Sequence, residues 1–449
     1  MRLWRRAVTR TQYPRVSARQ QQSGVAATDG AKLRRGVLKA YATGELDHAT
    51  WGELIKPGSD ALAPNASRRA RRLLNLYYSK VTAAEEGPRT ELAALLQGRG
   101  YGVHVHATAD EARRGSISEP DRVFLRLARK VGRTKGDILM AIDDGGFDTD
   151  HKALRGKWWV NPRPDPAMKD IHGYDFQNRT GNLKQNDHWG HSEGFIAHGT
   201  HVLGIATRGT HRIKAIGVAH MNSSAFGPEA ARYAIARGAK VINISRSLQD
   251  EGLVSEMVRI IRDNPKVLFV ESAGNSGALV KPEYASRYLA ANNLPNLITV
   301  AAADPEGLPQ AEPRSRTCFG PTITVAAPAK HFSSTYGFFG KEHGGYEYTG
   351  ATSQAAPFTS NVAAKCMLLA PHLRPTQVKQ LLVDTASTAS AWQGKVVANG
   401  MVNATRVYQL AAMVHLSRGG LTARKAATRI GLRGPERRQL EALVARYVD

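Results

Sequence analysis

The sequence predicts an α/β fold in which helices cover both faces of a mostly parallel sheet. Short apolar runs typical of buried strands lie at residues 241–244, 267–270, 297–301 and 323–326. Segments with a helical pattern stand between or after them, at residues 228–237, 253–262 and 375–385. Strands that alternate with helices along a chain form parallel sheets buried on both faces.

The length and composition allow one large domain with flanking segments. The chain has 449 residues, of which 42% are hydrophobic, enough for a sizeable core. Its only cysteines, Cys318 and Cys366, are too few to form a disulfide framework in a chain of this length. We find no metal-ligand spacing, and therefore expect neither a metal nor a cofactor.

Composition divides the chain into four parts. Residues 1–30 are polar, rich in Arg and Gln, and predict a disordered basic arm. Residues 31–136 carry mainly helical patterns and predict an accessory or partner-binding domain. Residues 137–415 hold the alternating strands and helices. Residues 416–449 predict a basic helical tail, which we interpret as a helical hairpin packed on the main domain rather than as a DNA-binding helix-turn-helix.

The formal net charge is +24, from 62 Lys and Arg against 38 Asp and Glu. Such a balance fits either a nucleic acid or another anionic partner bound through the flanks, or simple solubility. No apolar stretch approaches the length of a transmembrane helix. The basic start lacks the apolar core of a Sec-type signal peptide, so we expect a cytoplasmic protein or export by a non-Sec route; an organelle transit peptide also fits.

Three stretches carry the candidate chemistry. Residues 138–146, ILMAIDDGG, form an apolar run that ends in carboxylates and glycines, as at the carboxyl edge of a parallel sheet. Residues 197–206, AHGTHVLGIA, place His198 at the start of a helix of small residues. Residues 348–357, YTGATSQAAP, deliver the hydroxyl of Ser353 to the first turn of an apolar helix. Each has an ordinary structural explanation when taken alone, such as a turn or a helix cap.

Together these stretches resemble the subtilisin-like serine peptidases. Close variants of that family's Asp-Thr-Gly, His-Gly-Thr-His-Val-Ala-Gly and Gly-Thr-Ser-Met-Ala-Ala-Pro motifs occur here in the same order, which differs from the order in chymotrypsin-like enzymes and α/β-hydrolases. Residues 270–277, VESAGNSG, resemble the segment that carries the family's oxyanion asparagine, and residues 320–328 and 399–404 also agree. The resemblance covers residues 137–413 and implies a subtilisin-like three-layer fold. It also implies that residues 31–136 stand where members of the family often carry a propeptide.

The resemblance also implies a role for each matched residue. Ser353 would be the nucleophile, His198 the general base, and Asp143 the acid that orients the imidazole. Asn275 would donate a hydrogen bond to the oxyanion. Asp144 would stand where the family usually has Thr, as an exposed residue.

The substrate-binding segments depart from the family pattern. The resemblance places Ser245, Arg246, Ser247, Ala273 and Gly274 beside an extended protein or peptide substrate. The usual Ser-Leu-Gly-Gly is replaced by residues 245–248, SRSL, so a side chain stands where a P1 residue often passes. We therefore expect narrow specificity, such as small P1 residues. Calcium binding stays open, because residues 151–154, HKAL, lack one of the carboxylate ligands that the family uses.

Two other interpretations stay open. The altered substrate strand fits a degenerate family member that binds peptides without cutting them. The basic flanks fit a nucleic-acid-binding protein.

Overall fold

The computed structural model describes residues 118–132, 136–184, 192–220, 224–246, 248, 250–312, 315–335 and 345–448. Predictions that fall on residues 1–117, among them the basic arm and most of the helical N-terminal region, lie outside this part of the chain.

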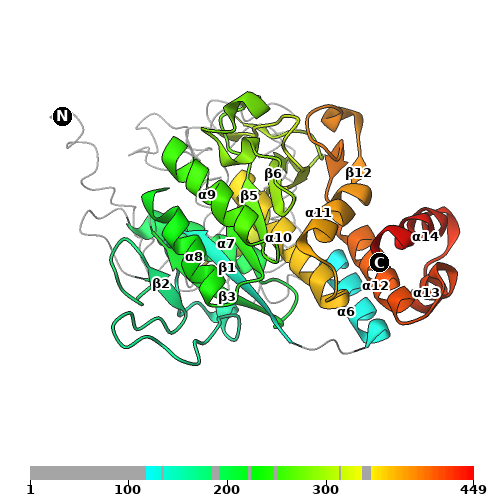
Figure 1. Ribbon diagram of the computed structural model, residues 1–449, viewed down its shortest axis with the longest axis horizontal. Helices are drawn as coiled ribbons and strands as arrows, with labels where there is room; N and C mark the ends of the chain where they lie inside the picture. The colour runs from blue at the N-terminus through cyan, green and yellow to red at the C-terminus, as the bar shows by residue number, and fades with distance from the viewer. Residues whose placement is uncertain are drawn as a thin grey trace, which may run out of the picture. The chain divides into compact units, whose positions relative to one another are not determined.

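The described residues form a central sheet of nine strands in the order β12-β13-β9-β6-β5-β4-β1-β3-β2 (Figure 1). All neighbouring pairs in it are parallel except β12 and β13. The sheet confirms the predicted α/β fold. Its strands are β1 (Ile138–Asp144), β2 (Gly173–Asp175), β3 (Ile213–Ala219), β4 (Val241–Ile244), β5 (Leu268–Ser272), β6 (Leu297–Ala303), β9 (Val325–Pro328), β12 (Ser387–Thr388) and β13 (Gly400–Met401).

Strands outside the central sheet form two small antiparallel ribbons. The first pairs β7 (Ala311–Glu312) with β8 (Ser315–Arg316), and the second pairs β10 (His331–Thr335) with β11 (Gly345–Thr349). Single turns of 3₁₀-helix lie at Lys152–Leu154, Ser224–Phe226, Pro282–Tyr284, Leu289–Ala291 and Ser390–Trp392.

Helices cover both faces of the sheet, as expected for parallel strands. One face packs against α7 (Ser192–Ala206) and the long α10 (Thr352–Leu369), and the other against α8 (Gly227–Ala236) and α9 (Glu251–Asp263). The helices α11 (Pro375–Asp384) and α12 (Ala404–Arg418) extend the α10 side. Because alternate residues of a strand point to opposite faces, Met140 and Ile142 belong to the α7 and α10 core, whereas Ala141 belongs to the α8 and α9 core.

The main domain was predicted to begin at residue 137, but it also includes helix α6 (Glu119–Val131). The helix belongs to the same compact unit as the sheet and packs against α12 and α10. Asp121 at its start forms a buried ion pair with Lys365 of α10, and Phe124 meets Tyr408 of α12 with ring centroids 5.7 Å apart. The apolar and ionic contacts thus attach this segment to the main domain.

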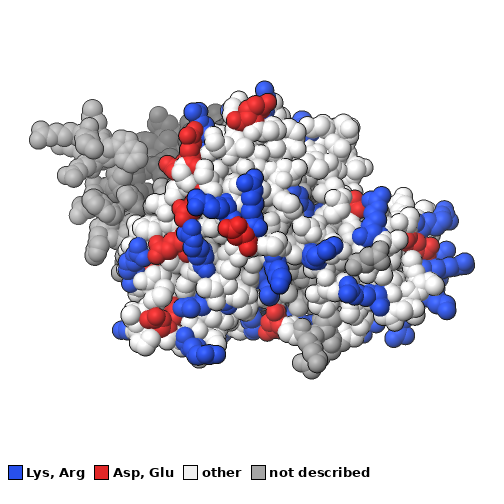
Figure 2. Space-filling view, in the orientation of Figure 1, with Lys and Arg blue, Asp and Glu red and all other residues white. Residues whose placement is uncertain are grey.

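The tail forms two helices, α13 (Ala423–Ile430) and α14 (Gly434–Val448), which both pack on α12. Figure 2 shows Lys and Arg side chains gathered around this end of the molecule. Their exposed members include Arg424, Lys425, Arg429, Arg433 and Arg438. An anionic partner for this surface stays a prediction. No helix in the described part of the chain combines the length and the apolar character needed to span a bilayer.

Candidate active site

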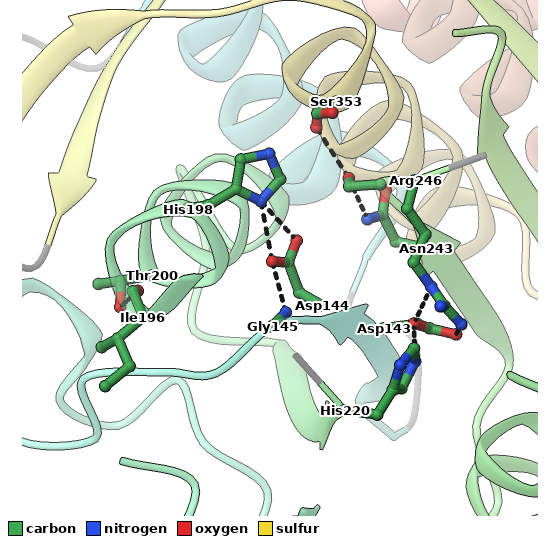
Figure 3. A network of polar contacts seen from close by, with 11 residues as sticks. Asp143, Asp144, Gly145, Ile196, His198, Thr200, His220, Asn243, Arg246 and Ser353 are labelled. Atoms are coloured by element: carbon green, nitrogen blue, oxygen red, sulfur yellow. Dashed lines mark hydrogen bonds and ion pairs between the residues drawn. The ribbon is translucent and has the colours of Figure 1, made fainter. Parts of the chain in front are cut away.

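The candidate site lies at the carboxyl edge of the central sheet, where β1 ends and two helices from the same face begin. Asp144 is the last residue of β1, His198 lies in the second turn of α7, and Ser353 lies in the first turn of α10. Figure 3 shows the imidazole of His198 between Asp144 and Ser353, with its second nitrogen on the side of Ser353. Residues far apart in the sequence thus lie at one edge of the sheet.

His198 pairs with Asp144, so the expected pairing of His198 with Asp143 is wrong. The Nδ1–H of His198 donates to the Asp144 carboxylate, with Nδ1 2.8 Å from Oδ1 and 3.1 Å from Oδ2. Asp144 lies on the face that carries α7, whereas Asp143, one residue earlier, lies on the opposite face. Asp144 is also buried rather than exposed, with 5% of its surface accessible.

Local contacts fix the orientation of the Asp144 carboxylate. The backbone N–H of Gly145 donates to Asp144 Oδ1 at 2.7 Å, which leaves the carboxylate directed toward His198. Burial lowers the pKa of His198, but the negative charge and hydrogen bond of Asp144 outweigh it and leave that pKa above its ordinary value. The imidazole side chain remains 37% exposed, so a substrate can reach it.

A glycine next to the histidine permits this close approach. A Cβ atom on Gly199 would lie 2.1 Å from the backbone oxygen of Gly146 and 3.2 Å from Asp144 Oδ1. This part of α7 therefore reaches the end of β1 only because residue 199 has no side chain. The His-Gly pair in the sequence has this physical basis.

A chain of hydrogen bonds holds the first turn of α10 that carries Ser353. Ser245 Oγ donates to the Ser353 carbonyl oxygen at 2.8 Å, and Asn243 Nδ2 donates to Ser245 Oγ at 2.8 Å. Ser360 Oγ, further along α10, donates to Asn243 Oδ1 at 2.9 Å. The end of β4 is thereby tied to the nucleophile's own backbone.

Asn275 lies beside the same helix start. Its Oδ1 accepts hydrogen bonds from the backbone N–H of Thr352 at 3.1 Å and from Thr352 Oγ1 at 2.8 Å. With the oxygen held in this way, the amide Nδ2 is the group that remains to donate toward a bound substrate. The exposed position of Asn275 suits that task.

The other predicted substrate residues occupy two neighbouring strand ends. Ser245 and Arg246 follow β4, and Ala273 and Gly274 follow β5. The Ala273 N–H donates to the Val300 carbonyl, and the Gly274 carbonyl accepts from the Cys318 N–H, both at 2.9 Å. Ser247 lies outside the described residues, so its effect on P1 stays a prediction.

Sequence reasoning assigned Asp143 and Arg246 other roles and missed both His220 and the contacts among these three residues. Asp143 contacts His220, just after β3, and Arg246, just after β4, on the face opposite His198 (Figure 3). No motif marks His220. The one sequence feature that pointed to this second network was the presence of two consecutive acids, Asp143 and Asp144.

The segment where the family has a calcium ligand, residues 151–154, forms a single 3₁₀ turn after β1. His151 caps this turn: its side chain is buried, and its Nδ1 accepts a hydrogen bond from the Ala153 N–H at 3.1 Å. Across the described ranges, no group of three or more His, Cys, Asp or Glu side chains is arranged to hold a metal ion.

Two curated proteins are similar to this chain over part of their length. A thermostable alkaline protease of Halalkalibacterium halodurans is 27% identical over 226 residues, which cover 47% of this chain and 58% of that protein. Mycosin-4 of Mycobacterium tuberculosis is 29% identical over 196 residues, which cover 39% and 43%. The match thus spans less than two thirds of each of these relatives.

Solved structures share the fold. A chain from the subtilase cytotoxin SubAB assembly is 17% identical with a TM-score of 0.51, covering 65% of this chain and 94% of that one. A lanthipeptide protease is 19% identical with a TM-score of 0.50, covering 66% and 96%. The model of the subtilase family, peptidase S8, matches residues 135–406. With more than half of its length matched, the chain belongs to the subtilase family.

Proposed function

We propose that the chain is a serine endopeptidase that hydrolyses peptide bonds through Asp144, His198 and Ser353. The contact that carries this proposal is the hydrogen bond of His198 Nδ1–H to the buried Asp144 carboxylate, on the edge where α10 presents Ser353. This pair is the orienting half of a catalytic triad. Family membership supports the same chemistry.

In the first step the Ser353 hydroxyl attacks the carbonyl carbon of the scissile bond. His198 Nε2 takes the hydroxyl proton and then passes it to the leaving amine, so that an acyl-enzyme ester remains on Ser353. Asp144 holds the imidazole in the tautomer with its proton on Nδ1 and stabilises the charged ring. A water molecule, activated by the same base, then hydrolyses the ester.

The oxyanion that forms in each step needs donors directed at it. Asn275 Nδ2 and the backbone N–H of Ser353, in the first turn of α10, are the groups we assign to this role. Such donors stabilise the transition state more than the ground state because charge develops on the oxygen only during reaction.

We assign the substrate an extended conformation along residues 245–248, where its backbone adds a strand and side chains enter neighbouring pockets. The replacement of a glycine in this segment by Ser247 is the reason to expect narrow P1 specificity. Cleavage of a peptide library is the measurement that checks it. Broad tolerance of large apolar P1 residues would contradict the expectation.

The test of the proposed function uses a fluorophosphonate probe, which forms a covalent bond with activated serines. The wild-type chain should be labelled and should hydrolyse peptides, and Ser353→Ala should do neither. Ser255→Ala, an exposed serine on α9, is the matched control and should behave as wild type. A folded wild-type protein that is neither labelled nor active would instead identify a subtilase that binds without cutting.

A further inference from the structure

A polar network of three side chains, Asp143, His220 and Arg246, lies on the sheet face opposite the His198–Asp144 pair. Asp143 Oδ1 accepts from His220 Nε2 at 2.6 Å and from Arg246 Nε at 2.9 Å. Asp143 Oδ2 accepts from Arg246 Nη2 at 3.3 Å. The Asp143 and His220 side chains are buried, and that of Arg246 is 18% exposed. Buried charges of this kind need such close partners.

The topology explains how one carboxylate reaches both partners. β1 is hydrogen-bonded to β3 on one side and to β4 on the other, with Asp143 opposite Val218 and Ile244. His220 comes directly after β3, and Arg246 comes two residues after β4, on the same face as Ile244. Asp143 therefore ties together the ends of three adjacent strands at the edge that holds the candidate site.

The segment after β4 is consequently held from both faces. Ser245 Oγ donates to the Ser353 carbonyl oxygen on one face, and the Arg246 guanidinium donates to Asp143 on the other. This same segment is the one along which we place the substrate backbone. Its position relative to Ser353 thus depends on two consecutive side chains.

We propose that Asp143 and Arg246 are positioning residues that hold the substrate-binding segment in register with the catalytic residues. The proposal rests on the proposed function. The two neighbouring carboxylates then have different roles. Asp144 orients His198, and Asp143 holds the peptide-binding segment in place through Arg246.

The charge state of Asp143 supports this role. Burial raises its pKa, but the charges and hydrogen bonds of Arg246 and His220 outweigh burial and lower the pKa to about 2. The carboxylate therefore stays ionised and keeps both of its partners throughout the neutral range. Glu271 is buried on the same face near Arg246, and burial raises its pKa well above the ordinary value.

The experiment compares a small probe with an extended substrate in Asp143→Asn, Arg246→Gln and the double variant. Fluorophosphonate labelling requires Ser353 and His198 but not an extended peptide. We expect labelling rates within about twofold of wild type, whereas kcat/KM for a substrate with four residues before the scissile bond falls on the order of 10²-fold. A substrate with one residue there should lose far less.

The remaining arms identify the cause. Because both residues act through one contact, the double variant should be no worse than either single variant. Arg246→Lys keeps the charge without the paired donors and should recover part of the loss; it also serves if Asp143→Asn fails to fold. Arg232→Gln, which breaks an ion pair with Glu256 on the surface, is the matched control and should change neither readout.

Two results would overturn the proposal. Equal losses in labelling and in both peptide substrates would indicate a general structural role, and no loss with the extended substrate would indicate no role. A wild-type protein that the probe does not label would instead contradict the proposed function, so the two failures are distinguishable.

Discussion

Asp143 and Asp144 are consecutive in β1, yet their carboxylates bind partners on opposite faces of the central sheet. Asp144 accepts a hydrogen bond from His198, and Asp143 accepts hydrogen bonds from His220 and Arg246. The alternation of side chains along a strand makes this division unavoidable. Two adjacent acids in one motif therefore have different neighbours, and substitutions at the two positions should differ in their effects.

Asp144→Asn should nearly abolish hydrolysis while leaving the protein folded. The amide cannot stabilise the charged imidazole and favours the wrong tautomer, so we expect kcat to fall by about 10⁴-fold. The charge and hydrogen bond of Asp144 raise the pKa of His198, and burial lowers it. The substitution removes the first effect and leaves the second, so the pKa of His198 should fall. Because the base must be neutral, the acid limb of the pH–rate profile should move to lower pH.

Steady-state kinetics between pH 5 and 10 checks this, with Asp143→Asn measured in parallel. The assignment of the triad acid fails if Asp143→Asn shows the large loss in kcat and the shifted acid limb while Asp144→Asn retains activity.

The sequence could not decide between the two acids. The Asp-x-Gly pattern fits twice, as Asp143-Asp144-Gly145 and as Asp144-Gly145-Gly146. In a strand with one exposed face, polar and apolar residues alternate, and the alternation shows which residues point to the same face. In β1, however, Met140, Ala141 and Ile142 are all fully buried, so no such alternation exists. Only the structure, in which Gly199 packs against Gly146, assigns the role to Asp144.

Other parts of the molecule differed in how far the sequence could predict them. Apolar runs predicted β4, β5 and β6, because a buried strand is a local feature. Ser353, His198 and Asn275 lie in local motifs, and the structure brings them to one edge. His220 and the docking of α6 depend on contacts with residues far away in the sequence, which no local pattern records.

Asn275→Asp should test the oxyanion assignment more sharply than alanine. The aspartate keeps an oxygen that can accept from Thr352 but loses the Nδ2–H donor. We expect kcat to fall by about 10²–10³-fold with little change in KM, since the donor acts mainly in the transition state. Thr352→Val, which removes only the hydroxyl bond to Asn275, should lose much less. A loss confined to KM would argue against the assignment.

The buried ion pair between Asp121 and Lys365 should make α6 essential to stability. Burial lowers the pKa of Lys365, and the negative charge of Asp121 opposes that effect. Without Asp121, the buried ammonium group of Lys365 loses the carboxylate that compensates its charge. We expect Asp121→Asn to lower the free energy of unfolding by about 3–5 kcal/mol. Replacing both partners by apolar residues, Asp121→Leu with Lys365→Met, should recover most of it.

Denaturant unfolding followed by circular dichroism measures these differences. Arg122→Gln removes an exposed ion pair with Glu119 on the same helix and should change stability little. Equal effects of Asp121→Asn and Arg122→Gln would show that the buried ion pair does not stabilise the domain.

Glu271 should make the stability of the folded state fall as pH rises. It is 1% exposed in β5, and Oε2 has no hydrogen-bond partner among the described residues. Burial raises its pKa well above the ordinary value, and a hydrogen bond from the Leu248 backbone and the charge of Arg246 oppose this only in part. The folded protein therefore holds a proton here that the unfolded chain releases at about pH 4.3.

A raised folded-state pKa fixes the sign of the effect on stability. The contribution is fully present below the pKa of the unfolded chain and is lost as pH rises through the folded-state pKa. Glu271→Gln keeps the shape and has no proton to lose, so its melting temperature should fall less than that of wild type from mildly acidic to alkaline pH. Glu283→Gln, an exposed glutamate, should follow wild type. Identical pH profiles for wild type and Glu271→Gln would mean that Glu271 is ionised in the folded protein.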